Sequence, residues 1–370
     1  MTESKRIRHW VVAGGGTGGH VTPALALAEQ IRKRGDEVLL MGTERGLETR
    51  LVPEAGFDLL ALPAQPIYGR DLSARLRSIP ATAHACWSAW RAMGAFGADF
   101  AISVGGYASM PAVIAAALRQ IPIAIVEPNA IPGRANRMAA RMAKQIFVQF
   151  EQATAIFSEV GAADRVRNTG VPLREKLVAT FAGAQARRVA ESPFRLLVAG
   201  GSQGARQINN AMIEAAPRLD AARIEIFHQA GEADRERTET AYRAAGVKAE
   251  VVGFEPDMPA RYRWADLALC RSGALSVAEL ALAGLPALLV PYPFAADDHQ
   301  TANAAALVAA GAAQMLDENP LGGERVVRAL REIFEIPEQI AAMGDSAAKL
   351  ARPDAAARII DDCAKQMGAR

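Results

Sequence analysis

Cysteine is scarce in this chain of 370 residues, which contains only Cys86, Cys270 and Cys363. The number is odd and the spacing is wide, so the sequence offers neither a disulfide framework nor a paired-cysteine metal site. Sparse, unpaired cysteines are typical of a reducing compartment. We therefore expect a cytoplasmic protein.

Long apolar runs are also missing. The most apolar stretches, 108–126 and 280–294, are interrupted by Arg119 or by prolines, and neither reaches the roughly 20 uncharged residues that span a bilayer. The start, MTESKRIRHWVVAGGG, is basic, but its apolar segment is too short for the core of a signal peptide. The sequence thus predicts neither secretion nor a membrane-spanning helix.

An excess of one charge is the third absence. Lys and Arg number 42 against 40 Asp and Glu, which gives a formal net charge of +2 and argues against nucleic acid as a partner. The hydrophobic fraction of 51% is that of a folded globular protein. The length suggests about two domains.

What the sequence does contain is a repeated alternation of short aliphatic runs and helical patterns. This alternation predicts βαβ units on buried parallel sheets. The pattern restarts near Phe194 after a polar stretch, 175–192, which we interpret as the connection between two doubly wound domains. A helix is expected at 23–34. The expected strands lie at 9–13, 37–41, 100–104, 123–126 and 145–148, and then at 194–200, 223–229, 249–254, 266–270 and 286–292.

Each series opens with a strand that runs into a glycine-rich turn, GGGTGGH at 14–20 and GGSQGA at 200–205. A turn of this kind exposes backbone N–H groups at a helix N-terminus, where an anionic group binds. Because both turns follow the carboxyl ends of strands, they suggest a cleft between the two domains.

The first turn also has another interpretation. Gly14, Gly16 and Gly19 satisfy GxGxxG, the pattern of a dinucleotide-binding dehydrogenase. However, the acidic residues Asp36 and Glu37 precede the second apolar run, whereas the usual acidic partner ends that strand. Glycines that serve only a tight turn are the third interpretation.

Three polar residues near the ends of the first-domain strands are candidates for chemistry. His20 stands near a helix start, where the helix dipole favours a neutral imidazole that can accept a proton; a capping or packing histidine is the alternative. Glu127 and Asn129 follow the strand expected at 123–126. The carboxylate is a candidate base or hydrogen-bond acceptor and the amide a candidate hydroxyl ligand, and turn chemistry is their alternative.

In the second half, the segment 271–279 follows a strand and opens a helix. Ser272 and Gly273 are expected to cap that helix, leaving N–H groups for an anion. Glu279, about two turns in, suits a ribose diol because a carboxylate accepts from both hydroxyls. A solvated helix acid is the alternative.

A second polar group is formed by Asp297, Asp298, His299, Gln300 and Asn303. We do not interpret it as a metal site, because hard metals collect carboxylates from several segments and the histidine has no companion. A pocket for sugar hydroxyls, with Gln300 as the amide ligand, fits better. Capping of the next helix by Asp297 or Asp298 is compatible with this.

The segment 68–93 places arginines beside tryptophans and aliphatic residues. This combination is typical of a surface that lies on anionic lipid without spanning it, and an ordinary amphipathic core helix is the alternative. The residues concerned are Arg70, Leu72, Arg75, Leu76, Arg77, Ile79, Trp87, Trp90 and Arg91.

Taken together, seven motifs in a fixed order, covering residues 11–304, resemble the MurG family of bacterial peptidoglycan glycosyltransferases. The resemblance implies a GT-B fold: α/β, with two Rossmann-like doubly wound parallel-sheet domains facing a cleft. It implies an acceptor domain at 1–174, a UDP-GlcNAc domain at 175–351, and a last helix, 352–370, that returns to the first. The motifs are GGGTGGH, GGYASMP, EPN, GVPLR, GGSQGA, RSGALSVAE and DDHQTANA.

The resemblance also implies an activity: inverting, metal-independent transfer of N-acetylglucosamine from UDP to the C4 hydroxyl of undecaprenyl-diphosphoryl-N-acetylmuramoyl-pentapeptide, which converts lipid I to lipid II. No cofactor is implied. The base would be His20 or, second, Glu127. The family's donor contacts fall on Thr17, Gly18, Gly19, Asn129, Arg174, Ser202, Glu255, Ala274, Leu275, Ser276, Val277, Ala278, Glu279 and Gln300.

A polyprenyl acceptor lies in a membrane, so the implied location is the cytoplasmic face of the bacterial inner membrane, as a peripheral protein. The partners are then UDP-GlcNAc, lipid I, an anionic inner-leaflet surface and other proteins of cell-wall synthesis. Two further functions stay open at this stage: a GT-B transferase with another lipid acceptor, and a non-catalytic module that binds a nucleotide sugar.

Overall fold

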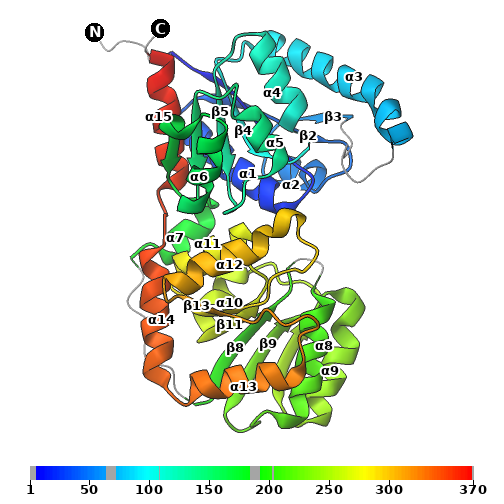
Figure 1. Ribbon diagram of the computed structural model, residues 1–370, viewed down its shortest axis with the longest axis vertical. Coiled ribbons are helices and arrows are strands. Elements are labelled where there is room, and N and C mark those ends of the chain that lie inside the picture. Colours follow the sequence, from blue (N-terminus) through cyan, green and yellow to red (C-terminus); the bar gives the residue numbers. More distant parts are fainter. Residues whose placement is uncertain (1–5, 64–71, 108, 184–191, 202–203, 369–370) are drawn as a thin grey trace. The chain divides into compact units, whose positions relative to one another are not determined.

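The chain divides into two compact units. A computed structural model describes residues 6–63, 72–107, 109–183, 192–201 and 204–368, and for residues 72–79 it describes the backbone alone. Unit 1 comprises Met1–Lys176 and Arg352–Arg370, and unit 2 comprises Leu177–Ala351. Figure 1 labels their elements, and each unit is described by itself.

Unit 1 is built on a seven-stranded sheet in which all neighbouring strands are parallel (Figure 1). The strand order is β3-β2-β1-β4-β5-β6-β7, so the order reverses between β1 and β4. The strands are β1 (His9–Gly14), β2 (Glu37–Thr43), β3 (Leu59–Leu62), β4 (Phe100–Gly105), β5 (Ile123–Glu127), β6 (Gln145–Val148) and β7 (Val166–Asn168).

Both faces of this sheet are buried. Successive side chains of a strand point to opposite faces, and β1 shows the result. Val11 lies in one apolar cluster with Met93, while Trp10 lies in the other with Leu25 and Ile359. The helices of this unit are α1 (Gly18–Lys33), α2 (Glu48–Glu54), α3 (Leu72–Phe96), α4 (Ser109–Leu118), α5 (Arg134–Ala139), α6 (Glu151–Glu159) and α15 (Ala355–Gly368).

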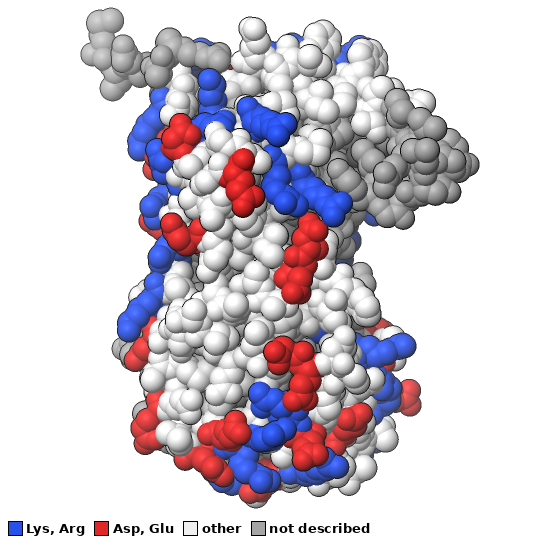
Figure 2. All heavy atoms as spheres, in the orientation of Figure 1, with Lys and Arg blue, Asp and Glu red and all other residues white. Residues whose placement is uncertain are grey.

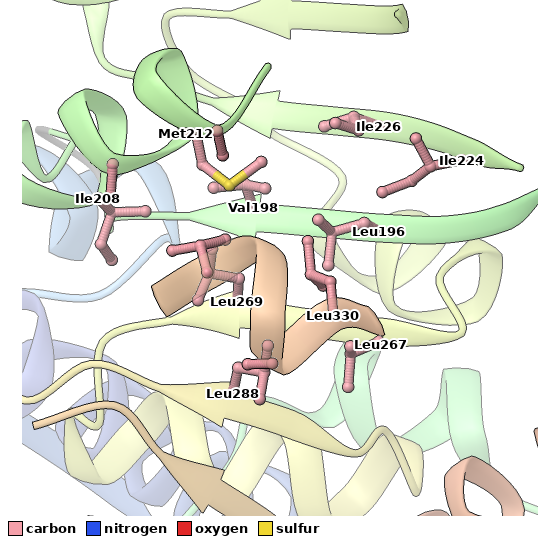
Figure 3. Close-up of a cluster of buried hydrophobic side chains, with 14 of the residues drawn as sticks. Leu196, Val198, Ile208, Met212, Ile224, Ile226, Leu267, Leu269, Leu288 and Leu330 are labelled. Carbon is pink, nitrogen blue, oxygen red and sulfur yellow. The ribbon is translucent and has the colours of Figure 1, made fainter. Parts of the chain in front are cut away.

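Unit 2 repeats the plan with a six-stranded parallel sheet of order β10-β9-β8-β11-β12-β13. In one core cluster, Leu196 and Val198 of the first strand meet Met212 and Leu330 from two covering helices (Figure 3). The strands are β8 (Phe194–Ala199), β9 (Ile224–Gln229), β10 (Lys248–Val252), β11 (Leu267–Cys270), β12 (Ala287–Leu289) and β13 (Ala313–Met315).

The helices of unit 2 alternate with these strands along the chain. Helix α7 (Glu175–Phe181) lies where the division between the units falls and occupies the start of the stretch predicted to be a connection. The others are α8 (Arg206–Ala215), α9 (Arg235–Ala244), α10 (Met258–Trp264), α11 (Ala274–Ala283), α12 (His299–Ala309), α13 (Gly323–Phe334) and α14 (Pro337–Lys349).

The ten predicted strands are all present, but β3, β7 and β13 were not predicted. These three have only three or four residues and lie at or near the edges of their sheets, so they carry little hydrophobic pattern. The helix predicted at 23–34 begins five residues earlier, at Gly18. The predicted start was wrong because proline is usually found in the first turn of a helix, whereas Pro23 lies inside α1.

Acidic and basic side chains are interspersed on the face of unit 2 that Figure 2 shows, in keeping with the balanced composition. Among the described helices, none combines the length and apolar character needed to cross a bilayer.

Candidate active site

The predicted site residues lie on the turns that follow the central strands of each sheet. In a doubly wound sheet, ligands bind beyond the carboxyl ends of the strands where the strand order reverses. In unit 1 this point lies between β1 and β4, whose last residues, Gly14 and Gly105, are partners after a shift in the register of the two strands. In unit 2 it lies between β8 and β11.

The first glycine turn connects β1 to α1. Its Gly16 has φ +93°, a left-handed conformation that favours glycine, and its N–H donates to the carboxylate of Glu48, 3.0 Å away at Oε2. Thr17 is the N-cap residue of α1, but its side chain makes no capping bond. Instead its hydroxyl lies 3.1 Å from Nδ1 of His20.

The second glycine motif of unit 1 makes room for the His20 ring. Gly105 and Gly106 have φ values of +95° and +80°. A Cβ on either would lie 3.4 Å from a ring atom, Cδ2 in the first case and Nδ1 in the second. The turns after β1 and β4 thus enclose one imidazole between them, as expected for a residue at the point of strand reversal.

Glu127 is buried at the end of β5 and accepts four hydrogen bonds. Its Oε1 accepts from the backbone and side-chain amides of Asn129, and its Oε2 accepts from Gly133 N–H and from Asn136 Nδ2 at 2.9 Å. Burial raises the pKa of Glu127, and these hydrogen bonds oppose that rise. Both oxygens are therefore engaged in holding the turn.

Asn136 was not predicted. Its Nδ2 donates to Val126 O and to Glu127, which fixes the orientation of the amide. Its Oδ1 is buried and makes no hydrogen bond within the described structure. A Cβ on Gly105 would lie 3.0 Å from Nδ2 of this amide and 3.4 Å from the His20 ring, so Gly105 leaves room for both side chains.

Arg174 is held elsewhere in unit 1. Its Nε donates to Glu29 Oε1 at 2.6 Å, and the other oxygen of Glu29 accepts from Glu175 N–H. Glu29 lies about three turns along α1 from Gly18. The structure therefore brings Thr17, Gly18, Gly19 and His20 together, but it does not bring Arg174 to them.

The second glycine turn, at 200–205, is supported directly by a neutral side chain. Gln229 donates from Nε2 to Gly201 O at 2.7 Å. The side-chain amide of Asn209 donates from Nδ2 to Ala230 O and to Asp234. Its Oδ1 is therefore the atom that faces His228, and it accepts from Nε2 of that ring. The other ring nitrogen, Nδ1, accepts from a tyrosine hydroxyl. Burial lowers the pKa of His228 to about 3, so the ring is neutral. The predicted contact Ser202 lies outside the described residues.

The start of α11 differs in one respect from the prediction. Gly273 is its N-cap residue, as expected, but the Ser272 side chain does not cap it. The Ser272 hydroxyl is buried and donates to Gln300 O at 2.8 Å, while Asn303 Nδ2 donates to Ser272 O. The serine therefore joins the starts of α11 and α12, and with them the predicted contacts of 274–279 and 300.

Gln300 and Asp298 both accept hydrogen bonds from nearby residues. Gln300 Oε1 accepts from Tyr292 N–H at 3.0 Å. Asp298 occupies the N-cap position of α12 with φ +52°, yet it makes no side-chain capping bond; its carboxylate accepts from Thr301 Oγ1. Among the described residues no group of three potential metal ligands gathers.

Glu279 lies on α11 against Tyr262, whose hydroxyl donates to Oε2 at 2.6 Å. Burial raises the pKa of Glu279 to about 7, and the tyrosine hydrogen bond partly offsets the rise. Oε1 is not engaged by this bond. A carboxylate with one oxygen fixed can present the other to a hydroxyl.

Glu255 is bound within its own loop. Its Oε1 accepts from Asp257 N–H and its Oε2 from Arg261 Nε, both at 2.7 Å. Burial works to raise the pKa of Glu255, but the bonds from Arg261 and Asp257 outweigh it and the pKa is lowered. This carboxylate, one of the predicted donor contacts, therefore holds the shape of its own loop.

Both halves of the chain match known families. Residues 10–148 match the glycosyltransferase family 28 N-terminal domain, and residues 195–359 match its C-terminal domain. A relative from Geobacter sulfurreducens, a UDP-N-acetylglucosamine--N-acetylmuramyl-(pentapeptide) pyrophosphoryl-undecaprenol N-acetylglucosamine transferase, is 41% identical over 95% of this chain and 97% of its own length.

Two solved structures share the fold. The crystal structure of MurG from Acinetobacter baumannii is 32% identical, covers 97% of this chain and 99% of its own, and has a TM-score of 0.79. The UDP-GlcNAc 2-epimerase of Neisseria meningitidis has a TM-score of 0.69 over 97% of this chain and all of its own, but only 14% identity, so it shows the fold alone. The chain has the GT-B fold and belongs to glycosyltransferase family 28, within its MurG family.

Proposed function

We propose that this protein transfers N-acetylglucosamine from UDP-GlcNAc to the C4 hydroxyl of undecaprenyl-diphosphoryl-N-acetylmuramoyl-pentapeptide, converting lipid I to lipid II. The observation that carries the proposal is 41% identity over nearly the whole length of a transferase with that name. The turns after the central strands of both sheets support it, because they hold the residues that such a reaction needs.

The predicted domain 175–351, which corresponds to unit 2, binds the donor. The predicted donor contacts Ala274 and Leu275 stand at the start of α11, where the positive end of the helix dipole favours an anionic group such as the diphosphate. Oε1 of Glu279 accepts from the ribose, and Gln300 binds sugar hydroxyls. The other predicted phosphate contacts are Ser202 and Arg174. For Arg174 to reach the phosphate, its hydrogen bond to Glu29 must break.

The predicted domain 1–174, which together with the last helix corresponds to unit 1, binds the acceptor. His20 is the base: when Nδ1 carries the hydrogen and donates it to Thr17 Oγ1, Nε2 is the basic nitrogen of the ring and takes the proton of the C4 hydroxyl. The oxygen then attacks the anomeric carbon opposite UDP, inverting it to a β-1,4 link. Glu127 holds Asn129 and Asn136 in place rather than taking the proton, because its oxygens already accept four hydrogen bonds.

UDP leaves with negative charge on its diphosphate. Preorganised N–H donors, Arg174 and Ser202 stabilise this charge, so we propose that the reaction needs neither a divalent cation nor another cofactor. The test is UDP release from UDP-GlcNAc, with and without a lipid I analogue, in EDTA. Release that depends on the acceptor and survives EDTA is expected. Release without acceptor would indicate hydrolysis, and none at all would indicate a binding module.

We further propose that the protein docks on the anionic inner leaflet of the plasma membrane. On α3, Trp87 and Trp90 are 53% and 41% exposed. The Arg91 guanidinium lies 5.7 Å from the Trp87 ring centroid, and that of Arg119, after α4, lies 4.0 Å from Trp90. Amphipathic rings beside cations suit a headgroup layer. The side chains of Arg70, Arg75 and Arg77, also predicted here, lie outside the described residues.

Sedimentation with vesicles tests this surface. Replacing both Trp87 and Trp90 by serine should reduce binding to phosphatidylglycerol vesicles, with little effect on turnover of a short-chain acceptor. Ile336→Ser is the matched control, because Ile336 is an equally exposed apolar residue of unit 2. Equal binding by the double variant and the control would contradict the proposed docking surface.

A further inference from the structure

Glu48 is a buried carboxylate that the mechanism above does not use. It is the first residue of α2 and only 1% exposed. Oε1 accepts from Thr43 N–H at 2.7 Å and from the Thr43 hydroxyl at 2.6 Å. Both oxygens face Gly16 N–H, at 3.2 and 3.0 Å. Hydrogen bonds to an ionised acceptor are stronger than neutral ones.

Three glycines from separate segments enclose this carboxylate. A Cβ on Gly15, in the first glycine turn, would lie 2.3 Å from Oε1 of Glu48, one on Gly42, in β2, would lie 2.5 Å from its Cγ, and one on Gly46, before α2, would lie 2.1 Å from its Oε2. No Cβ fits at such distances, so the backbone has closed around the carboxylate on three sides. Burial works to raise the pKa of Glu48, but the bonds from Thr43 and Gly16 outweigh it and the pKa is lowered.

The position of Gly16 bears directly on His20. Gly16 precedes Thr17, whose hydroxyl is hydrogen-bonded to His20 Nδ1. On its other side Gly16 faces Tyr107, since a Cβ there would lie 3.1 Å from the tyrosine ring. The glycine is thus held between Glu48 and Tyr107, and its single N–H is directed at the carboxylate. Any change that releases this N–H allows Thr17 to move relative to the imidazole.

We infer that Glu48 is a positioning residue for the transfer reaction: by fixing Gly16 it fixes the Thr17 hydroxyl that sets the tautomer and orientation of His20. The inference rests on the proposed function, in which His20 is the base. Glu48 touches no substrate. Its contribution is to keep His20 oriented so that Nε2 faces the C4 hydroxyl of the acceptor. Even small displacements of a catalytic group lower the reaction rate considerably.

Glu48→Gln separates this role from a merely structural one. The two donors of Thr43 attract the glutamine oxygen, which turns the amide NH₂ toward Gly16 N–H and places two donors face to face. We expect kcat to fall by roughly 30-fold, with the KM for UDP-GlcNAc changing less than twofold. Thr43→Val is the matched control: it removes a hydrogen bond from the same carboxylate without affecting Gly16, and should leave kcat within about threefold.

A double-mutant cycle shows whether Glu48 acts through the histidine. In a His20→Ala background, Glu48→Gln should cost less than about threefold. An undiminished loss in that background, or equal losses of kcat for Glu48→Gln and Thr43→Val, would overturn the inference. A wild-type protein without acceptor-dependent turnover would instead contradict the proposed function, and wild-type turnover by His20→Ala would contradict the choice of base.

A spectroscopic measurement gives a readout independent of activity. The chain has five histidines, so selective ¹⁵N labelling gives a simple imidazole spectrum, in which loss of one set of signals in His20→Asn assigns His20. In the wild type His20 should show one tautomer, with the hydrogen on Nδ1. Glu48→Gln should produce a mixture, and Thr43→Val should not. An unchanged His20 spectrum in Glu48→Gln would contradict the inference.

Discussion

The two glycine-rich turns follow the first strand of two sheets with the same central strand order, yet they are supported in opposite ways. Under the turn of unit 1 lies a carboxylate, Glu48, which accepts from a backbone N–H. Under the turn of unit 2 lies a neutral amide, Gln229, which donates to a backbone carbonyl. In unit 1 a backbone N–H of the turn is engaged by its support, and in unit 2 a backbone carbonyl is engaged.

This difference bears on which ligand each turn can take. The buried charge of Glu48 opposes a phosphate placed close to it. In unit 2 Gln229 and His228 are neutral, and the charge of Asp234, which Asn209 contacts, is paired with Arg237. The topology alone would make both turns phosphate sites. The supports favour the diphosphate in unit 2 and an uncharged sugar hydroxyl at His20 in unit 1, as the proposed division of labour requires.

The largest expected effect comes from removing the base of unit 1. His20→Ala should lower kcat by about 1000-fold, within the range for loss of a general base, while UDP-GlcNAc binding stays within about twofold because the predicted contacts at 274–279 and Gln300 lie in unit 2. Steady-state turnover and calorimetric binding measure the two quantities. His84→Ala, an exposed histidine of α3, should match the wild type on a short-chain acceptor. A fall in UDP-GlcNAc affinity of similar size in His20→Ala would argue against the division of labour.

The next effect concerns the donor side. Glu279→Gln should weaken UDP-GlcNAc binding by about tenfold at pH 8, because an uncharged amide replaces the ionised acceptor of ribose hydroxyls, which is worth about 1.5 kcal/mol or more. The Tyr262 hydroxyl still finds an oxygen to donate to, so the fold should hold. Glu250→Gln, an exposed acid paired with Arg261, is the control. Unchanged affinity in Glu279→Gln would remove Glu279 from the ribose site.

Much of this arrangement was predictable from the sequence, and the reasons differ by residue. Central strands such as β4 and β8 are mostly apolar runs followed by glycines, so periodicity locates them, and the turns after β1 and β11 locate His20 and the start of α11. Edge strands such as β7 have three residues and no such signal. The predicted Ser272 cap was wrong because tertiary contact with Gln300 took its hydroxyl.

Other site residues were missed because their partners are distant in sequence. Tyr262 supports Glu279 from 17 residues away, and Glu48 supports Gly16 from 32 residues away. For Glu48 a signal existed: glycines at 42 and 46 in GTERGLE indicate a backbone that closes around something. A single sequence does not say what it encloses.

A smaller effect is expected on the pH dependence of UDP-GlcNAc binding to unit 2. Because the pKa of Glu279 is raised to about 7 and ribose hydroxyls bind the ionised form, affinity for UDP-GlcNAc should rise about tenfold from pH 6 to pH 8. UDP-GlcNAc suits the measurement better than UDP, since esterification of both phosphates leaves no phosphate proton titrating near pH 6. The rise should be absent in Glu279→Gln. A wild-type affinity independent of pH would mean that the carboxyl does not meet the ligand.

The last effect is on stability, and its sign follows from the same carboxyl group. Between its ordinary pKa of 4.5 and about 7, the folded state binds the Glu279 proton and the unfolded state does not. The unfolding free energy therefore falls as pH rises through this window. Glu279→Gln cannot lose that proton, so its stability relative to the wild type should improve by roughly 2.5 kcal/mol between pH 5 and pH 8, which is a shift of several degrees in Tm. Thermal unfolding at both pH values measures this difference of differences. If the stability difference between Glu279→Gln and the wild type were the same at pH 5 and pH 8, Glu279 would keep its charge in the folded protein. Its surroundings would then be polar enough to hold an ionised carboxylate.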